Sequence, residues 1–527
     1  MPDIVLTTFN AKYIHPALGL RYLKANLGPL KDRAAIMEFD LRFPPAAAAE
    51  RILAAKPRIV GIGVYIWNLI LVRQLVASIR AGAPSVAIVL GGPEAGYAPD
   101  DEPAVGAADH VIAGEGEVAF RDLCFAFLTG EKSAQRVFGA ERVNVPSPPS
   151  PARALRPSSL SPHTGTVTGS APEDHETGDG VGKQMHAAPP DLAALAMPYD
   201  LYTDDDIAHR FIYVEATRGC PFRCEYCLSS LEHGVRRFPM PAFLAAVDRL
   251  LERGALRFKF VDRSFNANGR VSLEVLDFFL DRLRPGLMLH FELVPDRLPA
   301  AILARFRRFP PGVLRFEVGI QSFNPAVNRR IGRVQDNRIA ASNLRLLRRE
   351  TGALIHADLI AGLPGEDMDS FGRGFDRLME LAPHEIQVGP LKNLRGTAIA
   401  RHAKRWNMTF NTAPPYEVLE TRSIPRADMD RLHRFARYFG MFHNSGHFAR
   451  SMPRLWALGP SRFAVFMAFG DWLFARLGRA HAIPLNELAA ALFEYLRLNG
   501  DDPAGAETAV RADYEHKTRR ERLRLRL

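Results

Sequence analysis

Cysteine is scarce in this chain. Only four cysteines occur among 527 residues, and three of them, Cys220, Cys224 and Cys227, lie within eight consecutive positions. A disulfide framework spreads its cysteines along the chain, whereas such crowding is typical of metal or redox chemistry. The remaining Cys124 stands alone in an apolar, helix-like stretch, where we expect a buried and unreactive thiol.

Long apolar runs are also missing. The longest of them, such as Phe463–Phe469, fall far short of the roughly 20 residues that a membrane-spanning helix needs. The N-terminal run Ile4–Thr7 has the pattern of a strand and follows no basic region, which argues against a secretory signal. We therefore expect a cytoplasmic protein with no membrane partner.

A nucleic-acid-binding motif is absent too, although the net charge is +10. Much of the excess charge lies in the tail Arg511–Leu527 and in the helix-like run Arg345–Arg349. Basic tails are more often solvated helices, and no RNP-type aromatic motif or zinc-finger spacing accompanies this one. We expect a small-molecule substrate rather than a nucleic acid.

Residues 1–135 alternate between strand-like and helix-like segments. The predicted strands are Asp3–Thr7, Ala34–Phe39, Ile59–Val64, Val86–Leu90 and His110–Ala113. Helical segments separate them, and this alternation favours a parallel sheet with helices on both faces. The sequence therefore predicts an N-terminal α/β domain built on a doubly wound parallel sheet.

Residues 144–190 break this pattern. Pro146–Pro162 is rich in proline and serine, and Thr164–Gly182 is rich in glycine, threonine and acidic residues. A segment with so few large apolar residues does not bury enough surface to offset the entropy lost on ordering. We predict a flexible linker here.

Strand and helix patterns alternate again over residues 205–400. The predicted strands are Phe211–Glu215, Arg257–Val261, Met288–Leu293, Leu314–Ile320, Ile355–Ile360 and Glu385–Val388. Six strands alternating with helices predict a partial or full α/β barrel. Over residues 415–527 the strand signals vanish, and we predict an all-α C-terminal domain with helices at Arg431–Phe442, Ser461–Leu477, Pro484–Leu498 and Ala504–Leu527.

The cysteine triplet has the spacing C-x3-C-x2-C and follows the first predicted strand of the barrel. Thiolates are the usual ligands of iron–sulfur clusters, and three of them hold three corners of a cube. One iron is then left without a protein ligand. Such an iron can chelate the amino acid end of S-adenosylmethionine, and the cluster can pass an electron to its sulfonium. The alternative is a structural zinc site, which needs a fourth ligand such as His233 at a spacing unlike that of a zinc finger.

Residues 211–397 resemble the radical S-adenosylmethionine superfamily, whose signature is this triplet with an aromatic residue before the last cysteine. The resemblance implies that Cys220, Cys224 and Cys227 hold a [4Fe–4S] cluster and that Tyr226 lies beside the adenine. It also implies a flavodoxin- or ferredoxin-type electron donor.

Further positions follow from the same resemblance. They are Asp262 near the methionine amino group, Glu292 at the ribose, Gln321 and Arg333 in a pattern of coproporphyrinogen dehydrogenase-like members, and Asp358 on the adenine side. This chain lacks the Gly-Gly-Glu motif that often stands where Asp262 does. An acidic residue at a strand end also has a simpler explanation, since it often caps the next helix.

The N-terminal domain resembles the cobalamin-binding fold of the anaerobic magnesium-protoporphyrin cyclase-like class, in a subgroup defined by an uncharacterised helical C-terminal domain. The resemblance rests on three runs: Asn10-Ala-Lys-Tyr13-Ile-His15, Gly91-Gly92-Pro93-Glu94 and Gly114-Glu115-Gly116-Glu117. Glycines at strand ends let a cofactor approach the backbone. No D-x-H-x-x-G run occurs, so we expect no histidine from that motif on cobalt.

The combined resemblance implies an enzyme that forms a 5′-deoxyadenosyl radical and removes hydrogen from an unactivated carbon. Cobalamin would then carry a methyl group to that carbon; oxidative cyclisation or rearrangement is the alternative. A methylthiotransferase acting on RNA needs a second cysteine triplet, which four cysteines do not supply. A non-enzymatic iron–sulfur or cobalamin sensor is the third hypothesis, although a sensor needs no nucleoside site.

Overall fold

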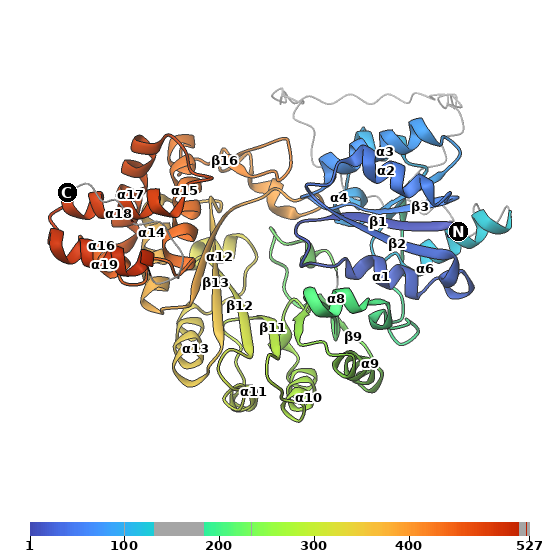
Figure 1. The fold of residues 1–527 in the computed structure, drawn as a ribbon, viewed down its shortest axis with the longest axis horizontal. Helices are drawn as coiled ribbons and strands as arrows, with labels where there is room; N and C mark the ends of the chain where they lie inside the picture. Colours follow the sequence, from blue (N-terminus) through green and yellow to red (C-terminus); the bar gives the residue numbers. More distant parts are fainter. Residues whose placement is uncertain (100, 131–183, 233, 516–522, 524–527) are drawn as a thin grey trace, which may run out of the picture.

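The computed structural model describes residues 1–99, 101–130, 184–232, 234–515 and 523. They form an N-terminal α/β domain, a central α/β domain and a C-terminal helical domain (Figure 1). No helix in these ranges is long and apolar enough to cross a bilayer.

The N-terminal domain contains a six-stranded, all-parallel sheet in the order β2-β1-β3-β4-β5-β6. Its strands are β1 (Ile4–Asn10), β2 (Ala34–Asp40), β3 (Ile59–Gly63), β4 (Ala87–Gly91), β5 (His110–Ala113) and β6 (Gln184–His186). Its main helices are α1 (Leu18–Ala25), α2 (Pro45–Ala54), α3 (Leu69–Gly82) and α6 (Glu117–Thr129), with the short α4 (Pro93–Gly96) and α5 (Pro103–Ala107) between them. Separate apolar clusters cover the two faces, which confirms the doubly wound prediction.

One strand of this sheet was not predicted. Most of the predicted linker 144–190 lies outside the described residues, but its last part, from Gln184, forms β6 and pairs with β5. A strand of three residues at a sheet edge carries too little periodicity to stand out from a polar segment.

The central domain has a second parallel sheet, in the order β14-β13-β12-β11-β10-β7. Its strands are β7 (Ile212–Val214), β10 (Arg257–Phe260), β11 (Met288–Leu293), β12 (Leu314–Gln321), β13 (Leu354–Ala361) and β14 (Glu385–Pro390). Helices α9 (Met240–Glu252), α10 (Gly269–Leu280), α11 (Ala300–Phe306), α13 (Asn337–Glu350) and α14 (Met368–Glu380) cover its outer face (Figure 1). Because β7 and β14 are the two edges of this sheet, the barrel is partial.

The C-terminal domain contains α15 (Arg426–Phe439), α17 (Arg462–Leu477), α18 (Leu485–Leu498) and α19 (Pro503–Glu515), of which α15 and α17 pack against the α14 side of the barrel. A dense group of phenylalanines, including Phe375 of α14, Phe435 and Phe463, joins the two domains. A short hairpin, β15 (Thr409–Phe410) and β16 (Val418–Glu420), precedes these helices and was not predicted. The last residues of the predicted helix Ala504–Leu527 lie outside the described ranges except for Leu523.

Candidate functional site

The cysteine triplet lies on a loop that begins in an antiparallel hairpin. Strand β8 (Thr217–Cys220) pairs with β9 (Gly234–Arg237), so Cys220 ends one arm and the loop to Cys227 lies between them. Gly219 has a φ of +89°, and a Cβ there would lie against the carbonyl oxygen of Gly234. Thr-Arg-Gly-Cys therefore needs glycine to bring the first cysteine out of the hairpin.

Arg333 links this loop to the strand ends of the barrel. Its guanidinium lies 3.1 Å from the Tyr226 hydroxyl and 3.8 Å from Cys224 Sγ, and it donates to the carbonyl of Gly319. A β-bulge follows Gly319, and Gln321 adopts a φ of +66° there. The structure thus brings together Cys224, Tyr226 and Arg333, which the sequence analysis named separately.

Asp262 is hydrogen-bonded to the segment that leads into the cysteine loop. Its buried carboxylate accepts hydrogen bonds from the Ala216 backbone (3.1 Å) and from the Thr217 hydroxyl (2.6 Å), at the start of β8. Burial raises the pKa of Asp262 to about 6. Its carboxylate therefore positions the strand that carries Cys220, and its predicted contact with the methionine amino group stays a prediction.

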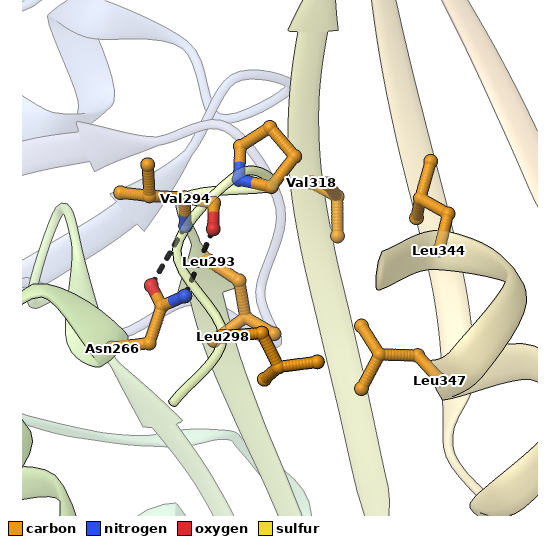
Figure 2. Close-up of a pocket in the computed structure, with 8 residues that line it drawn as sticks. Asn266, Leu293, Val294, Leu298, Val318, Leu344 and Leu347 are labelled. Carbon is orange, nitrogen blue, oxygen red and sulfur yellow. Dashed lines mark hydrogen bonds between the residues drawn. The ribbon is translucent and has the colours of Figure 1, made fainter. Parts of the chain in front are cut away.

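Asn266, four residues further along, has a related structural role. Its amide exchanges hydrogen bonds with the backbone of Val294, at 2.8 and 2.9 Å, beside a cavity lined by Leu293, Leu298 and Val318 (Figure 2). The cavity measures about 10 Å³, enough for no more than one water molecule. Asn266 fixes the turn after β11 and lines no substrate-sized space there.

Polar side chains line the inner face of the partial barrel. The strands alternate in burial, so that residues such as Glu317 on β12 and His356 on β13 point away from the outer helices. Glu317 lies 3.2 Å from His290 Nε2 and 3.4 Å from Lys259 Nζ, and the hydrogen bond from His290 lowers its pKa to about 2. This face therefore presents hydrogen-bonded polar and charged side chains to the inside of the partial barrel.

Two of the predicted positions belong to the same face. Glu292 lies 3.3 Å from Arg263, and Asp358 lies 3.0 Å from His356 Nε2. Burial raises the pKa of both carboxyl groups. Neither carboxylate caps a helix here, which leaves both in a position to bind a cofactor or a substrate.

The N-terminal domain meets the barrel through the loops at the carboxyl ends of its strands. After β1, Tyr13 donates to Asp205 and His15 Nδ1 lies 2.9 Å from the Tyr213 hydroxyl. After β4, Glu94 accepts from Tyr416 and pairs with Arg395 at 3.0 Å. Asn10 instead bonds Glu38 within the domain, at 2.9 Å.

Arg218 links the two domains through a buried group of ion pairs. Its guanidinium pairs with Glu115 and Glu117, both at 2.7 Å, and with Glu215 at 2.9 Å. Burial, despite Arg218, raises the pKa of Glu215 to about 7. The predicted cofactor residue Glu115 therefore contacts the strand that leads into the cysteine loop, and sequence reasoning missed its partner. The sequence offered one signal for this contact: an arginine in the Thr-Arg-Gly-Cys run and glutamates of opposite charge in the Gly-Glu-Gly-Glu run.

The donor set around the triplet fits a cluster. Three cysteines with no disulfide share one loop, Cys224 is buried, and the cation Arg333 lies near its sulfur. Within the described ranges, no three His, Cys, Asp or Glu side chains converge on a single metal ion. His233, the alternative zinc ligand, lies outside those ranges. Cys124 is fully buried, and burial raises its thiol pKa to about 12, so it is the inert thiol that was predicted.

The carboxyl edge of the first sheet fits a large flat ligand. Gly92 and Gly114 have φ values of +96° and +88°, which keep side chains away from the ends of β4 and β5. Tyr13, Trp67 and Tyr97 are 38–47% exposed along the same edge. Aromatic faces and bare backbone provide the apolar surface and the close approach that a corrin needs.

Three family models match the chain in succession. A B12 binding domain matches residues 4–124, the Radical SAM superfamily matches residues 214–378, and a protein family of unknown function, DUF4080, matches residues 404–526. The predicted resemblance is thereby confirmed, and so are the predicted cofactors: cobalamin, S-adenosylmethionine and a [4Fe–4S] cluster. The match also favours a cluster over zinc, and an enzyme over a sensor.

Individual relatives are distant. Ribosomal protein uS12 methylthiotransferase RimO of Synechococcus sp. (strain CC9902) is 24% identical over 37% of this chain and 42% of its own length. Anaerobilin synthase of Escherichia coli O157:H7 is 26% identical over 24% of this chain and 26% of its own length. The chain thus spans about two fifths of the first of these relatives.

Solved structures show a similar fold over a longer stretch. The radical S-adenosylmethionine methyltransferase TsrM from Kitasatospora setae, solved with cobalamin and a [4Fe–4S] cluster, matches with a TM-score of 0.55 at 18% identity. The match covers 82% of each chain. At this identity the similarity shows the shared architecture.

Proposed function

We propose that this chain, a radical S-adenosylmethionine enzyme with a B12 binding domain and a DUF4080 domain, transfers a methyl group to an unactivated carbon of a small molecule. The observation that carries the proposal is the contact of Arg218 with Glu115 and Glu117. It joins the loop of the cluster ligands to the carboxyl edge of the domain that binds cobalamin. Two cofactor sites whose supporting segments are joined by ion pairs suit a reaction that uses both.

The cofactors supply the difficult chemistry: the cluster provides an electron to S-adenosylmethionine, and cobalamin carries a methyl group. Cys220, Cys224 and Cys227 would hold the cluster. Arg333 orients Tyr226, and we infer that Gln321, Glu292 and Asp358 hold the nucleoside. The N-terminal domain contacts the segment before the barrel through Tyr13 and the strand β7 through His15.

We infer that the substrate is polar. Lys259, His290 and Glu317 form a hydrogen-bonded group on the inner face, and His356 lies beside Asp358. A purely hydrocarbon substrate would leave these groups desolvated without new partners, which is costly.

The test is an anaerobic preparation reconstituted with iron and sulfide, then loaded with hydroxocobalamin. S-adenosylmethionine with a labelled methyl group is added together with a reductant. We expect S-adenosylhomocysteine, 5′-deoxyadenosine and retention of the label on cobalamin or on an acceptor. The Cys224→Ala variant should lose the cluster and all products, whereas the matched Cys124→Ala variant should keep both.

Two results would contradict methyl transfer. If 5′-deoxyadenosine forms without S-adenosylhomocysteine or label transfer, the reaction is a cyclisation or rearrangement and not a methyl transfer. If the reconstituted protein retains its cluster but no corrin after gel filtration, no methyl transfer through cobalamin takes place.

A further inference from the structure

Unpaired cations gather beside the cysteine loop. The group consists of Arg223 in the loop, Arg329 at the end of α12 (Pro325–Arg330), and Lys404 and Arg405 after the turn Ala398–His402; we call it the basic patch. All four are exposed. Within the described part of the chain none of them forms an ion pair, whereas many other arginines have a carboxylate partner, as Arg395 does at 2.9 and 3.0 Å.

Short contacts bring three separate chain segments together here. The Glu225 amide donates to the carbonyl of Ile331 at 3.0 Å, which places the end of α12 against the loop. Arg330 stacks over Trp406 at 4.3 Å, and Arg405 lies 5.8 Å from the same ring. The positive charges of Arg329 and Arg405 both act on Arg330.

The same contacts hold the patch next to the cluster ligands. Glu225, between Cys224 and Tyr226, is buried, with His402 Nε2 at 2.8 Å and Arg401 on its other oxygen. Arg401 offsets the charge of Glu225, the only acid among residues 220–227, and His402 contacts its other oxygen. Glu225 therefore does not offset the four cations of the patch, and Cys220 and Cys227 of the same loop are only half-buried.

We propose that the basic patch docks an acidic one-electron donor protein. The inference rests on the proposed function, because each cleavage of S-adenosylmethionine begins with one electron from outside the protein. In the docking step the donor loses one electron and the cluster gains it; no covalent bond forms or breaks. Complementary charge speeds such encounters, and redox partners bind through small, transient interfaces.

A protein donor suits this surface better than a nucleic acid. Single-stranded nucleic acids need aromatic faces on which bases stack. Trp406, the aromatic residue next to Arg405, is covered by Arg330. The patch therefore offers charge with no free stacking platform.

The test compares two double variants with the same change in charge. Arg329→Glu/Arg405→Glu reverses the patch, and Arg338→Glu/Arg345→Glu reverses two exposed arginines on the outer helix α13. Binding of a purified, oxidised flavodoxin to the cluster-loaded protein is measured by calorimetry at low and at high salt. We expect the patch variant to weaken binding by about tenfold or more at low salt, and the control by less than about twofold.

Cluster reduction separates this proposal from the proposed function. With dithionite, all three proteins should bleach the cluster absorbance and cleave S-adenosylmethionine equally. Loss of cleavage in all of them would count against the proposed function and not against docking. Three results would overturn the docking proposal. They are equal weakening of flavodoxin binding in both variants, unchanged binding in both, and binding of single-stranded DNA that competes with flavodoxin.

Discussion

Arg333 is the residue that ties the cysteine loop to the barrel. Replacing it by methionine removes its hydrogen bonds to Tyr226 and to the Gly319 carbonyl, together with the positive charge near Cys224. Hydrogen bonds from a charged donor contribute about 1.5–3 kcal/mol each. We expect Arg333→Met to release iron to a chelator at least about tenfold faster than the unchanged protein.

The control for this prediction is Arg338→Met, an exposed arginine on α13. Its rate of iron release should equal that of the unchanged protein. If the Arg333→Met variant released iron at the same rate as the unchanged protein, the contacts of Arg333 would not stabilise the loop.

Glu366, in the Gly-Leu-Pro-Gly-Glu turn after β13, should make the stability of the fold depend on pH. One oxygen accepts from Ser322 (2.5 Å) and Ser370 (3.3 Å), the other is buried without a partner, and burial raises the pKa to about 7. Folding therefore favours the neutral acid, and this residue's contribution to stability falls as the pH rises from about 4.5 to about 7.

Glu366→Gln mimics the neutral acid at every pH. It should raise the free energy of unfolding at pH 8 by an amount on the order of 3 kcal/mol and change little at pH 4. Thermal unfolding measured across this range tests the prediction. Glu380→Gln, exposed at the end of α14, is the matched control, and a parallel profile for the two variants would refute the assignment.

Single residues also mark how far the sequence alone could be interpreted. The triplet was identified from its spacing, and Tyr226 and Arg333 from the family resemblance, but only folding brings Arg333 beside Cys224, 109 positions away. Asp262 and Glu115 were both named for cofactors, yet their carboxylates contact backbone or Arg218. A carboxylate's partner depends on tertiary contacts that one sequence does not encode in any local pattern.

The hairpin β8–β9 is the element that presents the first cysteine. Gly219→Ala places a Cβ against the Gly234 carbonyl and forces an alanine to a φ of +89°. Such strain costs about 1–3 kcal/mol, so we expect the variant to hold several-fold less iron after reconstitution, measured per chain. Gly269→Ala, at a helix start with open space around it, should hold as much iron as the unchanged protein.

Element prediction succeeded where periodicity was long. Met288–Leu293 was predicted with its observed bounds, and the helix Ser461–Leu477 to within one residue of α17, because buried strands and long apolar helices carry a sustained pattern. The hairpins β8–β9 and β15–β16 have arms of two to four residues, and β6 has three. Such short strands form because a neighbour offers backbone hydrogen bonds, and this cause lies outside the local sequence.

At the scale of the whole molecule, buried ion pairs join the N-terminal domain to the barrel. Arg395 bridges Glu94 and Glu102, whose side chains are 5% and 2% exposed. Arg395→Met leaves two buried acids without that partner, and breaking a buried pair costs about 3–5 kcal/mol. We expect calorimetry to show a lower unfolding temperature for the N-terminal domain.

The comparison variant is Arg33→Met, whose pair with Asp3 is largely solvated. Surface pairs contribute at most about 1 kcal/mol, so its unfolding temperature should change little. A similar decrease in both variants would show that the Arg395 bridge adds nothing beyond an ordinary surface pair.

The contact of Arg218 with Glu115, Glu117 and Glu215 has a thermodynamic consequence. Arg218 lies two residues before Cys220, and Glu115 lies at the edge where the corrin would bind, so we expect the loading of one cofactor to organise the groups that receive the other. Linkage is reciprocal: whatever factor the cluster adds to the affinity for hydroxocobalamin, the corrin must add to the retention of iron. Titrations of hydroxocobalamin into the apo and cluster-loaded forms should differ, and Arg218→Met should make them equal. Each bound cofactor would then make the protein bind the other more tightly, so that the two would be bound together.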